Sequence, residues 1–233
     1  MRTPPPETVA GMNQPPLKLR LSAEALGSFF LFTTVIGSGI MAANLSGGNV
    51  AVALLANSSA TGAILFVLIT MLGPISGAHM NPAVSLVAAS RRELGWAEAG
   101  AYIGTQLAFG ILGALAAHAM FDLPLLQWSA KARTGIGQWL GEAIATFGLI
   151  LTILGTVRHR PAWVPASVAL YITAAYWFTS STSFANPAIT VARGLSDTFA
   201  GIAPNDVPLF IVAQLLGAAG AALVARWMFD DQS

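Results

Sequence analysis

Residues 77–84 read Gly-Ala-His-Met-Asn-Pro-Ala-Val, and residues 184–189 read Phe-Ala-Asn-Pro-Ala-Ile. The shared tripeptide is formed by Asn81, Pro82 and Ala83 in the first stretch and by Asn186, Pro187 and Ala188 in the second. Asparagine is a favoured N-cap because its side-chain oxygen accepts a backbone N–H that has no partner inside the helix. Proline suits the first helical turn, where its missing N–H would have had no partner. Both stretches therefore predict the start of a helix.

Charged residues are scarce on either side of these two stretches. The chain of 233 residues carries 11 Lys and Arg and 10 Asp and Glu, 9% in all, whereas a soluble domain has about 25%. Uncharged runs cover residues 25–90, 99–121, 143–157, 161–192 and 207–225. Because a membrane-spanning helix needs roughly 20 mostly apolar residues, we predict an integral membrane protein. A soluble enzyme, a nucleic-acid-binding protein and, without cysteine, a disulfide scaffold are excluded.

Turn-forming and charged residues divide the uncharged runs into six expected spans, at residues 22–43, 50–72, 99–121, 136–157, 163–180 and 207–229. Two apolar pieces, 81–90 and 187–196, are too short to cross a bilayer and are re-entrant candidates. Residues 1–20 contain five prolines, which is typical of a flexible tail. Basic residues in the short loops place the tail and both termini in the cytoplasm.

The two halves of this single domain repeat one another. Glu24 pairs with Glu142, Asn81 with Asn186, and Gln106 with Gln214, at sequence offsets of 118, 105 and 108. The first repeat is expected at 21–121, with its half-helix at 81–90, and the second at 136–229, with its half-helix at 187–196. Each holds three spans, an odd number, so the second repeat must be inverted in the membrane.

An inverted repeat brings the two helix starts face to face near the middle of the membrane. Their positive dipole ends then point at one spot, where leftover asparagine N–H groups can donate to a passing molecule. Such a centre repels cations and protons but admits small neutral hydroxylated solutes. The alternative is a pair of ordinary N-caps in loops.

The motifs resemble those of the aquaporin and aquaglyceroporin (major intrinsic protein) family over about residues 22–229, through residues 76–84, 186–188, Glu24 and Glu142. The resemblance implies an all-α integral membrane fold with six transmembrane helices and two re-entrant half-helices. It also implies one pore per subunit, a homotetramer in the lipid bilayer, no cofactor and no enzymatic activity. Glu24 and Glu142 would hold loop backbones inside the bundle.

The chain departs from the family where most members carry an arginine directly after the second motif, because Ile189 stands there. The resemblance places the other positions of the constriction at Thr61, Ala174 and Ser183. These side chains would make a wider, uncharged opening that favours solutes larger than water. Arg193 follows one helical turn after Ile189 and either reaches the pore mouth or ties down the next loop through Asp197.

His79 lies two residues before Asn81. It either lines the inner vestibule, where its titration could modulate flow, or bonds the adjacent loop as a neutral side chain.

Residues 180–185 and 194–202 are similar to aquaglyceroporin-type channels of bacterial arsenic-resistance operons. This similarity implies a bacterial inner-membrane channel for glycerol-like solutes, arsenous acid and methylated arsenicals. One alternative is a water and glycerol channel with no arsenic role. Others are an ion-coupled secondary transporter, which would need ionisable groups at the membrane midplane, and a structural membrane protein.

Overall fold

The protein is described by a computed structural model that covers residues 14–230. Within these residues the fold is all-helical, with six long helices and two short ones. In chain order they are α1 Leu17–Leu45, α2 Val50–Ser76, α3 Pro82–Ser90, α4 Trp96–Met120, α5 Ile136–His159, α6 Val164–Phe178, α7 Pro187–Gly194 and α8 Val207–Ala225. The predicted fold class, six long helices with two half-helices, is confirmed.

Five of the long segments are long and apolar enough to cross a membrane: α1, α2, α4, α5 and the stretch from Pro204 to Phe229 that contains α8. The sixth expected span, 163–180, forms α6, which has only 15 residues and follows a 3₁₀ turn at Pro161–Trp163. It ends early because Thr179 adopts an extended conformation, with ψ of 140°.

The predicted tail of residues 1–20 needs one correction. Residues 1–13 lie outside the described residues, but residues 17–20 already form the first turn of α1. This helix begins directly after Pro15 and Pro16, because proline is tolerated where a helix starts.

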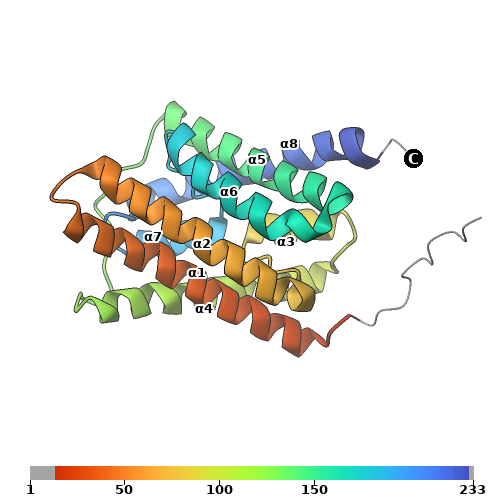
Figure 1. Cartoon of the computed structure of the whole chain (residues 1–233), viewed down its shortest axis with the longest axis horizontal. Coiled ribbons are helices and arrows are strands. Elements are labelled where there is room, and N and C mark those ends of the chain that lie inside the picture. Colours follow the sequence, from red (N-terminus) through yellow and green to blue (C-terminus); the bar gives the residue numbers. More distant parts are fainter. Residues whose placement is uncertain (1–13, 231–233) are drawn as a thin grey trace, which may run out of the picture.

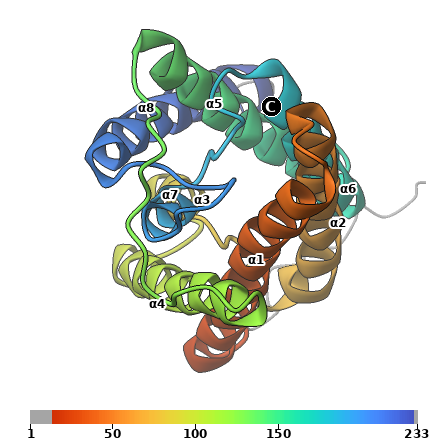
Figure 2. The same cartoon turned by 90° about the vertical axis from the view of Figure 1, so that its left-hand side faces the viewer.

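The six long helices form an open ring, and α3 and α7 lie between α4 and α8, where the ring is open (Figure 2). In Figure 1, α7 occupies the left half of the bundle and α3 the right half. The start of α1 and the end of α8 both lie at the right-hand end of the bundle, which we call the terminal end (Figure 1). The opposite, distal end is crossed by the loop of residues 122–135 (Figure 2).

Both half-helices start at the predicted asparagines. The Asn81 side chain accepts a hydrogen bond from the backbone N–H of Ala83 at 2.9 Å. The Asn186 side chain accepts from the backbone N–H of Ala188 at 3.0 Å and of Ile189 at 3.3 Å. The sequence pattern of cap, proline and alanine therefore produces the same local structure twice.

The loops that lead into the half-helices also share a backbone conformation. Ala78 and Met80 have φ of 48° and 47°, and Ser183 and Ala185, each 105 positions later, have 50° and 48°. Residues other than glycine rarely adopt positive φ. Two equal pairs of such residues therefore show that the inverted repeat extends to the detail of the backbone.

Candidate functional site

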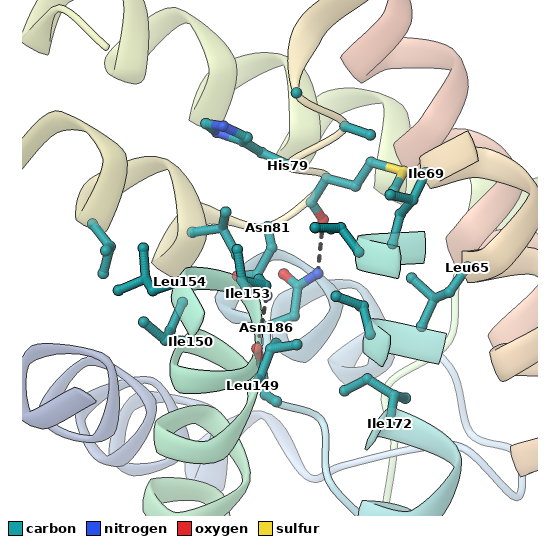
Figure 3. Close-up of a pocket in the computed structure, with 18 of the residues that line it drawn as sticks. Leu65, Ile69, His79, Asn81, Leu149, Ile150, Ile153, Leu154, Ile172 and Asn186 are labelled. Carbon is teal, nitrogen blue, oxygen red and sulfur yellow. Dashed lines mark hydrogen bonds between the residues drawn. The ribbon is translucent and has the colours of Figure 1, made fainter. Parts of the chain in front are cut away.

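A cavity of about 430 Å³ passes the place where the N-terminal ends of the two half-helices meet. Figure 3 shows Asn81 and Asn186 pointing toward one another in its wall. The rest of the wall at this level is apolar and comes from α2, α5 and α6; its labelled members are Leu65, Ile69, Leu149, Ile150, Ile153, Leu154 and Ile172. At the level of the asparagines the cavity is therefore polar along one stripe and apolar around the rest.

The two asparagines bond reciprocally across the repeat axis. Asn81 Nδ2 donates to the carbonyl of Ala185 at 2.8 Å, and Asn186 Nδ2 donates to the carbonyl of Met80 at 2.8 Å. Each amide nitrogen carries two hydrogens, so one N–H per asparagine remains for a solute. The number of asparagine N–H groups free to bind a solute is therefore half that expected from the sequence. The other N–H of each amide binds the loop of the opposite repeat.

Glu24 binds the loop that leads into α3. Its Oε1 accepts from the backbone N–H of His79 at 2.8 Å and from Ser76 Oγ at 2.7 Å. Its Oε2 accepts from the backbone N–H of Met80 at 2.7 Å and from Gln106 Nε2 at 2.8 Å. The buried carboxylate thus orients the residues that immediately precede Asn81.

Glu142 makes the equivalent contacts in the second repeat. It accepts from the backbone N–H groups of Phe184 at 2.8 Å and Ala185 at 2.9 Å, and from Gln214 Nε2 at 2.6 Å. Neither Glu142 nor Glu24 lines the cavity. Both carboxylates therefore bind the backbones of the loops, as the family resemblance implies, and neither lines the cavity.

Three of the four expected constriction residues, Thr61, Ser183 and Ile189, line the cavity. Ala174 does not: it lies exposed on the outer face of α6. Ile172 and Tyr176, which lie two positions before and two positions after Ala174, are buried and line the cavity instead. A shift of two residues turns a side chain to the opposite side of a helix, so the expectation for Ala174 is corrected to Tyr176 and Ile172.

Arg193 also lines the cavity, and only 2% of its surface is exposed. Its Nε donates to the carbonyl of Ala200, and its guanidinium lies 3.3 Å from the centre of the Phe184 ring. Asp197, the expected partner, instead accepts from the backbone N–H of Ala130 at 2.9 Å. Arg193 therefore faces the cavity and also binds the following loop, although through Ala200. The expectation of an uncharged opening is corrected accordingly.

Arg133, in the loop that crosses the distal end, was not among the predicted site residues. Its Nε donates to the Gly201 carbonyl at 2.8 Å and its guanidinium donates to the Ser181 carbonyl at 3.0 Å. The guanidinium carbon lies 4.8 Å from the Phe184 ring centre. A single arginine in a loop carries no sequence signal for these contacts, since they join segments nearly 50 and 70 residues away.

His79 lines the same cavity on the α3 side of the asparagines (Figure 3). Its Nδ1 lies 3.1 Å from Ser85 Oγ, and its ring packs edge-on against Tyr102 with centroids 5.3 Å apart. His79 therefore lines the cavity, and its ring contacts α3 and α4 instead of the adjacent loop.

Comparison with known proteins agrees with this architecture. The family model described as Major intrinsic protein matches residues 12–180. The chain is 54% identical to Aquaglyceroporin AqpS of Rhizobium meliloti (strain 1021), over 92% of this chain and 91% of that protein. It is 32% identical to Aquaporin AqpM of Methanothermobacter thermautotrophicus, over 92% of this chain and 99% of AqpM.

Among solved structures, the aquaglyceroporin from Plasmodium falciparum has the same fold, with a TM-score of 0.70 and 18% identity. The alignment covers 93% of this chain and 97% of that one. Proteins of the matched family are membrane channels for small solutes and not enzymes. With the paired half-helices, the cavity between them and the extended sequence match, this chain belongs to the major intrinsic protein family.

Proposed function

We propose that this channel is passive and conducts small neutral hydroxylated solutes, with glycerol-like molecules, arsenous acid and methylated arsenicals as its substrates. The observation that carries the proposal is the two-sided cavity wall at the level of the paired asparagines, with asparagine N–H groups on one stripe and aliphatic side chains opposite them (Figure 3). A polyol or a small oxyacid presents oxygen atoms to the stripe. Its remaining surface requires fewer hydrogen bonds than an ion's hydration shell does.

Passive flow is favoured by the residues near the paired asparagines. Coupling to an ion gradient needs ionisable groups at the substrate site, and the two Asn-Pro-Ala motifs offer only asparagine amides there. Among the described residues that line the cavity, the acidic one is Glu93, whose Oε1 pairs with Arg91 Nε at 2.8 Å after the end of α3. Glu24 and Glu142 are occupied by hydrogen bonds outside the cavity.

The solute size is inferred from Ile189. It is buried, lines the cavity and follows the second Asn-Pro-Ala directly. An aliphatic side chain here leaves more room than an arginine would, which favours solutes larger than water. Arsenous acid is a neutral trihydroxy molecule of about glycerol's size, and the absence of cysteine leaves no thiol to trap trivalent arsenic.

We further propose a homotetramer in a bacterial inner membrane, with both termini in the cytoplasm. The orientation is supported by the basic residues. Those expected in the cytoplasm are Arg2, Lys18, Arg20, Arg91, Arg92, Arg158, Arg160 and Arg226, against Lys131, Arg133 and Arg193 outside.

The test compares flux of water, glycerol and arsenous acid into liposomes that contain the wild-type protein or Ile189→Arg. The wild type should conduct both larger solutes. The variant should lose most glycerol and arsenous acid flux while retaining water flux, because a guanidinium at this position would fill the opening. Ile189→Val, which keeps an aliphatic side chain, is the matched control and should behave as wild type. Unchanged arsenous acid flux in Ile189→Arg would overturn the role given to Ile189.

A further inference from the structure

We propose that a hollow between the end of α5 and the start of α6 binds the phosphate group of an anionic lipid. The hollow has a volume of about 530 Å³ and lies at the terminal end of the bundle (Figure 1). A single stretch of chain lines it, through Gly155, Thr156, His159, Arg160, Trp163 and Ser167. None of these six residues lines the solute cavity, so the hollow is a separate site on another face of the same two helices.

The lining of this hollow is rich in hydrogen-bond donors. Five of its six residues carry a side-chain group that can donate: a guanidinium, an imidazole, an indole and two hydroxyls. None of these five side chains forms a hydrogen bond with a described residue. The non-bridging oxygens of a phosphodiester accept hydrogen bonds and carry the negative charge. A phosphate therefore fits the chemistry of the hollow better than a group that must donate.

Arg160 gives the hollow a positive charge. It forms no ion pair with a described residue, and the chain has no Asp or Glu between Glu142 and Asp197. A guanidinium binds phosphate through two parallel N–H bonds, and basic pockets between membrane helices bind anionic headgroups. A zwitterionic lipid also carries a phosphate, but its cationic end would find no carboxylate in the lining of the hollow. An anionic lipid is therefore the better match.

Contacts around the hollow hold its donors in position. The His159 ring packs edge-on against Phe229, with centroids 5.6 Å apart. Gly155 makes room for this contact, because a Cβ atom added there would lie 2.9 Å from the Phe229 ring. The backbone N–H of Trp163 donates to the Arg160 carbonyl at 2.8 Å within the 3₁₀ turn. This turn keeps Arg160 and Trp163 in the wall of one hollow.

An apolar face leads away from the hollow and favours a lipid over free phosphate. Trp163, Leu170 and Trp177 are 63%, 69% and 48% exposed, and their spacing of seven residues places them on one side of α6. Tryptophan is typical of the membrane–water interface. Leu170 lies about 10 Å further along the helix, at a rise of about 1.5 Å per residue, which is within one leaflet of the hydrocarbon core. The acyl chain of a lipid bound by its phosphate would lie on this face.

The experiment measures lipid binding to the purified full chain by native mass spectrometry, with phosphatidylglycerol and phosphatidylcholine of identical acyl chains. The wild type should bind phosphatidylglycerol more tightly. Arg160→Gln should weaken phosphatidylglycerol binding about tenfold or more, the effect of losing hydrogen bonds to a charged group, and remove the preference. Arg92→Gln is the matched control, because Arg92 is also exposed but lies after α3, outside the hollow. It should keep the wild-type preference.

Two further measurements identify the source of the phosphate. Leu170→Asn, which alters only the face for the acyl chain, should weaken phosphatidylglycerol binding about threefold or more. Equilibrium dialysis with inorganic phosphate alone should show no saturable binding.

Three results would overturn the inference. The first is saturable phosphate binding that Arg160→Gln abolishes, without a lipid preference, since the hollow would then hold soluble phosphate. The second is equal binding of the two lipids by the wild type. The third is dissociation of an oligomer by Arg160→Gln, since another copy of the chain would then fill the hollow. Because solute flux is not measured, each of these results leaves the proposed function unaffected.

Discussion

At the scale of single residues, the two buried glutamates show how charge is tolerated inside this bundle. Glu142 is fully buried and accepts three hydrogen bonds, two of them from backbone N–H groups. Bonds to a charged group are stronger than neutral ones, and here they hold a loop whose residues have positive φ. The charge therefore stabilises a strained backbone.

We expect Glu142→Gln to lower the free energy of unfolding by about 2–4 kcal/mol, because the amide brings its own N–H groups against backbone donors and leaves at least one unpaired. Thermal unfolding in detergent, followed by tryptophan fluorescence, measures the loss. Glu93→Gln is the control: its side chain is 54% exposed and pairs with Arg91, so its effect should stay within about 0.5 kcal/mol. Equal melting temperatures for both variants would contradict the role given to Glu142.

At the scale of elements, α1 and α4 approach closely at Gly113. A Cβ atom added there would meet the backbone carbonyl oxygen of Phe29 on α1. Thr33 Oγ1 lies 2.7 Å from the Phe29 carbonyl oxygen and, across the same contact, 3.0 Å from that of Gly113, so its one hydrogen is shared between them. Small residues permit such close approaches between membrane helices. The arrangement of the long helices around the half-helices depends on these close approaches.

Gly113→Ala should therefore destabilise the protein by about 1–3 kcal/mol, since the obstacle is backbone and the helices must separate. Gly104 lies on the same helix with no atom near its added Cβ. Gly104→Ala should be neutral or stabilising by up to about 1 kcal/mol, because alanine is the better helix former. Thermal unfolding of the two variants side by side checks this, and similar behaviour of both would count against close packing at Gly113.

At the scale of the whole molecule, the described chain starts and ends at one end of the bundle, and the loop of residues 122–135 crosses the other (Figures 1 and 2). Lys18 and Lys131, the chain's two lysines, lie on opposite ends. Lys131 Nζ donates to the Phe199 carbonyl at 2.7 Å. Partial burial, together with the charges of Arg133 and Arg193, lowers the pKa of Lys131 to about 8.

A membrane-impermeant amine reagent applied to intact cells should modify Lys131 half-maximally near pH 8, and Lys18 only after permeabilisation. Mass spectrometry of the peptides measures both. The unfolded chain keeps the Lys131 proton up to about pH 10.5, whereas the folded chain releases it near pH 8. The contribution of Lys131 to stability therefore rises with pH across that window. Labelling of Lys18 in intact cells would reverse the proposed orientation.

Much of this protein could be predicted from its sequence. The shortage of charge determined the membrane location, because a bilayer tolerates few unpaired ions, and the two Asn-Pro-Ala motifs determined both half-helix starts through local capping. Only the tertiary structure decided which side chains face the cavity. Tyr176 replaces Ala174 because a two-residue shift turns a side chain to the opposite side of its helix. Arg193 faces inward because Phe184 and Ala200 hold it there, and such contacts between distant segments leave no periodic signal in the sequence.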